Sequence, residues 1–99
     1  MIHEIALITI KPGTETEFET NVGKAAELFK RAKGCHGMQL QKGIESPLVY
    51  RLWVRWNTLE DHTVAFRESA DFQSWRTLVG HCFASSPQVK HTSTVVTGF

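Results

Sequence analysis

The sequence predicts an α+β fold in which a four-stranded antiparallel sheet carries helices on one face. Segments with a strand pattern and segments with a helical pattern follow one another in the order β-α-β-β-α-α-β. No repeat, linker or low-complexity tract interrupts them, so one domain is expected. This order is the split βαβ arrangement, called ferredoxin-like, with its second helix broken in two. Right-handed crossovers then place the first strand beside the third in the middle of the sheet.

The first strand and the first helix are the most clearly marked segments. Residues 2–10 have the composition of a strand and end at Lys11-Pro12-Gly13, where proline removes a hydrogen-bond donor. Thr14 and Glu17 have the spacing of a capping box, which predicts a helix that ends at Gly34. Its apolar positions recur every three or four residues, at Phe18, Val22, Ala25, Phe29 and Ala32.

Three further strands follow from the same patterns. Residues 36–44 and 48–56 are joined by Glu45-Ser46-Pro47, which predicts an antiparallel pair. A last strand is expected over residues 88–97, after the turn signal Ser85-Ser86-Pro87.

Two short helices are expected between the third and fourth strands. Asn57 and Glu60 have capping-box spacing and open the first of them, and Ser69 caps the second. One face of the first helix carries Leu59, His62 and Phe66. One face of the second carries Phe72, Trp75, Val79 and Cys82.

Both faces of the central strands are apolar, which is unusual for a sheet covered on one side. In the first strand, Ile5 and Leu7 lie on one face and the alternate apolar residues on the other. In the third strand, Val49 and Trp53 lie on one face, and Tyr50 and the apolar residues that alternate with it lie on the other. A bare apolar face would be a liability for a small monomer. The sequence therefore predicts a homodimer through this sheet face.

Composition excludes several classes of function. Eleven Lys and Arg against ten Asp and Glu give a formal charge of +1 without a basic stripe, so nucleic acid is not an expected partner. No apolar stretch approaches the length of a membrane span, and the first residues lack the pattern of a leader, so a cytoplasmic protein is expected. Two cysteines, Cys35 and Cys82, are too few to staple a secreted scaffold.

The run from Trp53 to Trp75 resembles the antibiotic biosynthesis monooxygenase (ABM) family, in which a strand ending in Trp leads into a short helix and then a Ser-x-x-Phe helix start. Other segments similar to this family are the Lys-Pro-Gly turn before the helix, Gly34-Cys35-His36-Gly37, and Pro87-Gln88-Val89-Lys90-His91. The resemblance covers nearly the whole chain and implies a single ABM-like domain over residues 1–99.

The resemblance also implies a dimeric α+β barrel with a ligand cavity in each subunit, between the sheet and the helices. Family members include cofactor-independent oxygenases of aromatic polyketide-like or quinol compounds, haem-degrading enzymes and proteins with no assigned activity. The residues that serve haem in the haem-degrading members are replaced here by Ala6, Phe66 and Trp75. No cofactor is therefore expected.

His62 is the candidate catalytic residue. Its place between Leu59 and Phe66 allows two interpretations, a hydrogen-bonded core imidazole or a pocket base that titrates near neutral pH. The candidate substrate-pocket residues are Trp53, Phe66, Trp75, His36 and His91.

These pocket candidates have alternatives too. Phe66 and Trp75 either pack in the core or stack on a flat ligand, and His36 and His91 either enter a pocket or face water. No metal site is expected, because no His-x-His or His-Glu-x-x-His occurs, and because the side chains within Cys35-His36 and within His81-Cys82 should diverge.

The leading hypothesis is a cofactor-independent monooxygenase of the ABM type that acts on a small aromatic or electron-rich molecule. Such an enzyme would remove a proton from its substrate, and the resulting carbanion would reduce dioxygen. The alternatives are a dimer that binds a small ligand without chemistry and, further off, a relative that binds or degrades haem.

Overall fold

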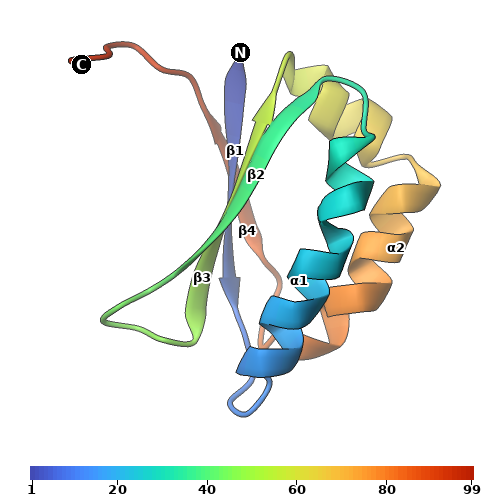
Figure 1. Cartoon of the computed structure of the whole chain (residues 1–99), viewed down its shortest axis with the longest axis vertical. Coiled ribbons are helices and arrows are strands. Elements are labelled where there is room, and N and C mark those ends of the chain that lie inside the picture. The colour runs from blue at the N-terminus through green and yellow to red at the C-terminus, as the bar shows by residue number, and fades with distance from the viewer.

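Four strands form one antiparallel sheet in the order β2-β3-β1-β4, and the helices cover one of its faces (Figure 1). The computed structural model describes residues 1–99. The strands are β1 (Ile2–Thr9), β2 (Cys35–Lys42), β3 (Val49–Trp56) and β4 (Gln88–Thr92). The helices are α1 (Glu15–Lys30), a π-helix (Asp61–Phe66), α2 (Ala70–Val79) and a short 3-10 helix (Gly80–Cys82). The predicted fold, with the first and third strands at the centre, is confirmed.

The core lies between the sheet and the helices. β1 and β3 pair so that Ala6 lies opposite Leu52 and Ile8 opposite Tyr50, which aligns their inward side chains. Strand alternation makes every second residue of both strands buried. α1 contributes four of its five predicted apolar positions, Phe18, Val22, Ala25 and Phe29, and α2 contributes Trp75 and Val79. The fifth, Ala32, lies beyond the end of α1 and is partly buried. One cluster of fifteen buried residues results.

The last strand is shorter than predicted. β4 ends at Thr92, which pairs with His3 near the start of β1. β1 begins at Ile2, so it offers almost no residues for β4 to pair with beyond Thr92. The sheet therefore cannot continue to residue 97. Residues 93–99 instead run away from the body of the protein (Figure 1), and Val95 is 90% exposed.

One of the three predicted caps is confirmed. The Ser69 hydroxyl accepts a hydrogen bond from Phe72 N–H at 3.2 Å and caps α2. Thr14 occupies the N-cap of α1, but its hydroxyl donates to the Lys11 carbonyl and makes no cap bond, so that capping box is wrong. Before the π-helix, the Thr58 hydroxyl accepts from Asp61 N–H, and the predicted Asn57 box is also wrong.

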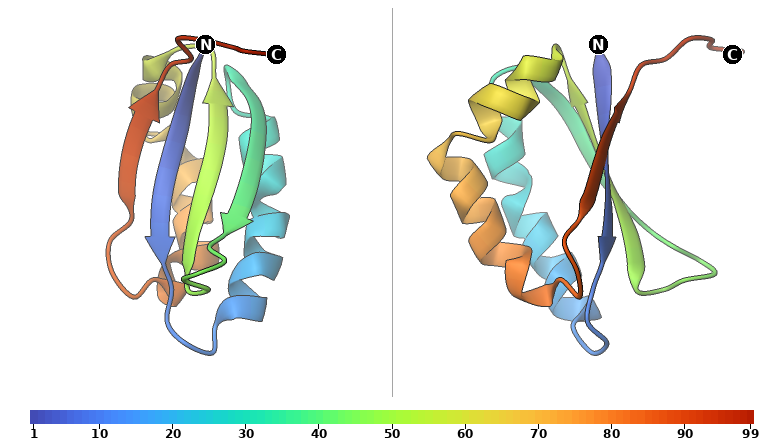
Figure 2. Two further views of the ribbon diagram at one scale, coloured as in Figure 1. Left: turned by 90° about the vertical axis from the view of Figure 1, so that its left-hand side faces the viewer. Right: turned by 180° about the vertical axis from the view of Figure 1, so that it is seen from behind.

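The second face of the sheet has no helix over it and is called the open face (Figure 2, left). Ile5, Leu7 and Trp53 lie there half-buried among polar neighbours. The indole N–H of Trp53 is buried without a hydrogen-bond partner. No helix of the structure is both long and apolar enough to cross a membrane.

Candidate functional site

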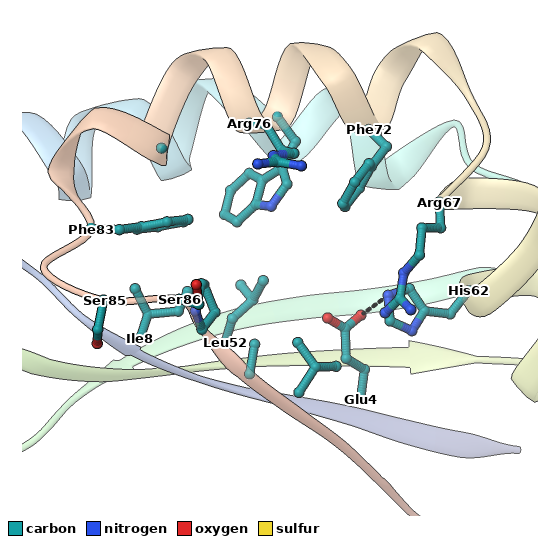
Figure 3. Close-up of a pocket in the computed structure, with 15 residues that line it drawn as sticks. Glu4, Ile8, Leu52, His62, Arg67, Phe72, Arg76, Phe83, Ser85 and Ser86 are labelled. Atoms are coloured by element: carbon teal, nitrogen blue, oxygen red, sulfur yellow. Dashed lines mark ion pairs between the residues drawn. The ribbon is translucent and has the colours of Figure 1, made fainter.

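A cavity of about 480 Å³ lies between the inner face of the sheet and α2 (Figure 3). Its volume falls in the range of small-molecule sites. The side formed by the sheet is apolar and includes Ala6, Ile8 and Leu52. The opposite side is aromatic and comprises Phe72, Trp75 and Phe83. The polar residues at one end are Glu4, His62 and Arg67.

Glu4 is a buried acid on the inner face of β1. It alternates with Ala6 and Ile8, so the strand directs its carboxyl group inward, and it is only 5% exposed. Its Oε1 accepts a hydrogen bond from the Trp56 indole at 3.1 Å. Burial raises the pKa of Glu4 to about 7, against a smaller lowering effect of the Trp56 bond and of Arg67. Near neutral pH this carboxyl group therefore exists in both protonation states.

His62 lies on the π-helix above Glu4 and is 2% exposed. Its Nε2 is 3.3 Å from Glu4 Oε1, the contact dashed in Figure 3, and its ring stacks on Trp56. Burial, reinforced by the positive charge of Arg67, lowers the pKa of His62 to about 4. The imidazole is therefore neutral at pH 7.

His62 reaches a third residue through its other ring nitrogen. Its Nδ1 lies 2.8 Å from Nε2 of His91 on β4. A neutral imidazole donates from one nitrogen and accepts at the other. When Glu4 is protonated it can donate to His62, which then donates to His91, and when Glu4 is ionised both bonds reverse. Glu4, His62 and His91, called the acid–imidazole chain here, thus link the buried end of the cavity to the edge strand β4, on which His91 is half-buried.

Two arginines line the same cavity without a carboxylate partner. Arg67 follows the π-helix and Arg76 lies on α2, and neither takes part in an ion pair. In Figure 3 the guanidinium group of Arg67 hangs beside His62, and that of Arg76 lies above the aromatic wall. Free guanidinium groups beside an apolar cavity suit a ligand that carries or develops negative charge.

The structure brings three of the predicted site residues to this cavity. His62 and Trp75 line it, and His91 bonds to His62. His62 matches the first interpretation, a hydrogen-bonded buried imidazole. It also borders the cavity, but burial lowers its pKa to about 4, so it does not titrate near neutral pH as the second interpretation expects.

The other three predicted residues lie elsewhere. Trp53 is on the open face, because it alternates with Leu52 and Val54, so its expected place in the cavity is corrected. Phe66 is buried between Phe29 and Trp56 and belongs to the core.

His36 leaves the inner face because of a β-bulge. Cys35 pairs with Trp56 and Gly37 with Arg55, which leaves His36 as the extra residue. Its ring is exposed and hydrogen-bonds to the Asn57 side chain at 2.7 Å. Of the two alternatives for His36, the structure therefore shows the second, an imidazole that faces water, and its expected place in the cavity is corrected.

Sequence reasoning missed Glu4, Arg67 and Arg76. Glu4 had a signal, since it is an acid at an inward position of an otherwise apolar strand. The arginines had none, because whether an exposed helical arginine borders a cavity depends on the packing of the helix against the sheet.

The fold and this site define a small ferredoxin-like α+β protein with an aromatic cavity around a buried acid and imidazole. The sequence profile of the antibiotic biosynthesis monooxygenase family matches residues 1–78. The chain belongs to this family.

Individual relatives agree with this assignment. The uncharacterized protein YczJ of Bacillus subtilis is 40% identical over 91 residues, which cover 92% of this chain and 96% of YczJ. The crystal structure of a family protein from Bordetella bronchiseptica is 54% identical with a TM-score of 0.95, and covers 96% of this chain and 97% of that one. SnoaB of Streptomyces nogalater, a cofactor-independent oxygenase, shares the fold at 18% identity and a TM-score of 0.82, over 98% of this chain and 95% of its own.

Proposed function

We propose that the protein is a cofactor-independent monooxygenase that oxidises a small aromatic or electron-rich molecule in the cavity beside Glu4. The observation that carries the proposal is a carboxyl group with a raised pKa inside a cavity with an aromatic wall. Family membership supports the reaction class. SnoaB, a cofactor-independent oxygenase, has the same fold, which supports it further.

Glu4 is the proposed base. His62, the catalytic residue expected from the sequence, is instead proposed as the partner of Glu4. A general base works best when its pKa lies near the working pH, and burial raises the pKa of Glu4 to about 7. A neutral His62, with its pKa lowered to about 4, is too weak a base to replace it but can relay a proton. Positioned acid–base groups contribute roughly 10²–10⁴-fold to a rate.

The acid–imidazole chain gives the abstracted proton a way out. After Glu4 takes the proton, it can donate to His62 Nε2, and His62 can donate from Nδ1 to His91. His91 lies half-buried on an edge strand, where it exchanges protons with water. The base is thereby returned to its ionised form without opening the cavity.

The remaining chemistry needs little from the protein. The substrate carbanion left by proton removal transfers electrons to dioxygen, and a C–O bond forms to give a peroxide anion. This anion takes up a proton from water and becomes a hydroperoxide. Loss of water breaks the O–O bond and leaves a carbonyl at the same carbon, so one oxygen atom enters the product and the other leaves as water. Phe72, Trp75 and Phe83 supply a flat apolar surface, and Arg67 and Arg76 supply positive charge for the anion.

The test is oxygen consumption with a panel of hydroquinones and anthrones. We expect turnover by the native chain and a loss of roughly 10²–10⁴-fold in Glu4→Gln, because the amide keeps the shape but cannot accept the proton. Leu59→Gln, an exposed change outside the cavity, is the control. Binding of these compounds without any oxygen uptake would contradict the enzyme and identify the protein as a ligand-binding dimer.

A homodimer through the open face is part of the proposal. Ile5, Leu7 and Trp53 give this face an apolar centre, and the Trp53 indole N–H lacks an acceptor within the chain. A second copy packed on the face would bury the apolar side chains and could supply the acceptor.

We also propose that residues 1–99 act as a single ABM-like domain and work in the cytoplasm. One hydrophobic cluster takes buried residues from β1, β3 and every helix, and β2 packs against it. Cys35 and Cys82 are free thiols, the state that a reducing compartment maintains. Fractionation of the native cells with an antibody to the protein tests the location, and its recovery outside the cytoplasm would contradict it.

A further inference from the structure

A second cluster of reactive side chains lies at the other end of α2 from His62. It comprises Glu17 in the first turn of α1 and the neighbours His81 and Cys82 in the 3-10 helix after α2. These segments are 64 residues apart in the sequence, but the start of α1 and the end of α2 lie together at one end of the molecule (Figure 1). The proposed oxygenase chemistry uses none of the three residues.

The three side chains converge on one point. Glu17 Oε2, His81 Nε2 and Cys82 Sγ all lie within 4.8 Å of one another. Cys82 Sγ is 3.7 Å from Glu17 Oε2, and His81 Nε2 bonds to the same oxygen. Tetrahedral zinc ligands bind at about 2.0–2.3 Å from the metal, which places them roughly 3.3–3.8 Å apart. The Cys82–Glu17 distance already has this spacing, whereas His81 and Glu17 are in direct contact and must move apart to admit the ion.

The chemistry of the donors selects the ion. A thiolate, an imidazole and a carboxylate suit zinc and neighbouring late transition metals, whereas magnesium and calcium require oxygen ligands. Three protein ligands leave one tetrahedral position for water. We propose that Glu17, His81 and Cys82 bind one Zn²⁺ ion.

Access and charge are consistent with this site. The side chains of Glu17 and His81 are each 53% exposed, so an ion can reach them and both can adjust to it. Cys82 is buried directly beneath, so its sulfur would bind the inner side of the ion. Coordination forms the Zn–S bond, and the thiol proton leaves to the solvent. The carboxylate and the thiolate together balance the charge of the ion.

The sequence could not indicate this site. Its third ligand comes from a distant helix, so no ligand spacing exists to be recognised. The sequence predicted that the side chains of His81 and Cys82 diverge, but both contact Glu17, and their ligand atoms lie within 4.8 Å of each other.

The ion would act on the cavity through the backbone. Gly80 and Phe83, which flank the two ligands, line the cavity. Zn²⁺ would link this part of the cavity wall to the start of α1 by coordination. Without the ion, the link consists of the contacts of His81 and Cys82 with Glu17.

The test is titration of ZnCl₂ into the full chain, without an affinity tag, after removal of metals by a chelator and in a reductant that lacks thiols. Isothermal calorimetry should show one ion per chain, and thermal unfolding should move to higher temperature with zinc. Cys82→Ser and His81→Ala should each weaken binding at least tenfold. His81 is half exposed, so His81→Ala should fold even if the cysteine variant does not.

Cys35 and His36 provide a matched control, because they form a second adjacent Cys–His pair. His36 bonds to Asn57 and Cys35 contacts a backbone carbonyl, without a third ligand. Cys35→Ser and His36→Ala should leave the zinc affinity unchanged. Co²⁺ should give the near-ultraviolet absorption of a cobalt–thiolate bond in the native chain and in Cys35→Ser, but not in Cys82→Ser.

Three results would overturn the site. The native chain could bind no zinc, which would leave Glu17 and His81 as a surface ion pair. His81→Ala could bind zinc as tightly as the native chain. The control pair could lose affinity to the same extent as His81→Ala.

Discussion

His91 on the edge strand completes the hydrogen bonding of the buried His62, with their ring nitrogens 2.8 Å apart. Burial lowers the pKa of both imidazoles, so both are neutral at pH 7. Two neutral rings joined in this way can pass a proton without either becoming charged for long. The arrangement makes the edge strand part of the proposed site.

His91→Ala should slow turnover roughly tenfold while KM changes little, because the proton leaves Glu4 more slowly but the cavity keeps its shape. Steady-state oxygen consumption measures both constants. Added imidazole should restore part of the lost rate, which a purely structural role would not allow. His36→Ala, on the exposed bulge, is the control and should keep the native rate.

Glu4→Gln should make the protein more stable at pH 8. The folded pKa of Glu4 is about 7, against 4.5 for the free group, so the stability that its proton binding gives is complete below pH 4.5 and lost by about pH 7. The native chain then buries an ionised carboxylate, at a cost of up to about 3 kcal/mol from 1.36 kcal/mol per pKa unit. Urea unfolding at pH 4.5 and pH 8 measures the difference, and an equal gain at both would contradict it.

Arg67→Gln should shift the acid limb of the pH–rate profile to higher pH. The positive charge of Arg67 lowers the pKa of Glu4, so its removal should raise that pKa further and require a higher pH to ionise the base. The profile of kcat/KM against pH measures the shift. Lys24→Gln, an exposed change on α1, should leave the profile in place.

Trp53→Glu should convert the protein to a monomer. A carboxylate at the centre of the open face would have to be buried without a partner in the dimer. Size-exclusion chromatography with light scattering at micromolar concentration measures the mass. Leu59→Glu changes an exposed apolar residue on the helical side and should stay dimeric. A native chain that is monomeric under these conditions would refute the dimer.

Gly34→Ala should destabilise the fold more than Gly13→Ala. Both glycines have positive φ, at +77° and +88°, which costs an alanine about 1–2 kcal/mol. Only at Gly34 would the new Cβ also meet another residue, at 2.6 Å from Asp61 Cγ, whereas Gly13 has open space. Denaturant unfolding of the two variants compares the costs, and equal values would show that Asp61 moves aside freely.

The sequence by itself determined the architecture. Period-two and period-3.6 patterns, the Pro-Gly turn and Ser69 are local signals, and they correctly predict the element order and the central pair of strands. They fail at strand ends and at two caps, where the competing partner of Thr14 is a backbone carbonyl and that of Asn57 is His36.

The tertiary structure alone decided which side chains form the sites. The alternation of β3 directs Trp53 away from the cavity, and a single extra residue in β2 moves His36 to the surface. Glu4, His62 and His91 meet across three elements, and Glu17 meets His81 and Cys82 across 64 residues. Local patterns depend on neighbours along the chain, whereas burial, pKa and ligand spacing depend on neighbours in space, which only the packed chain supplies.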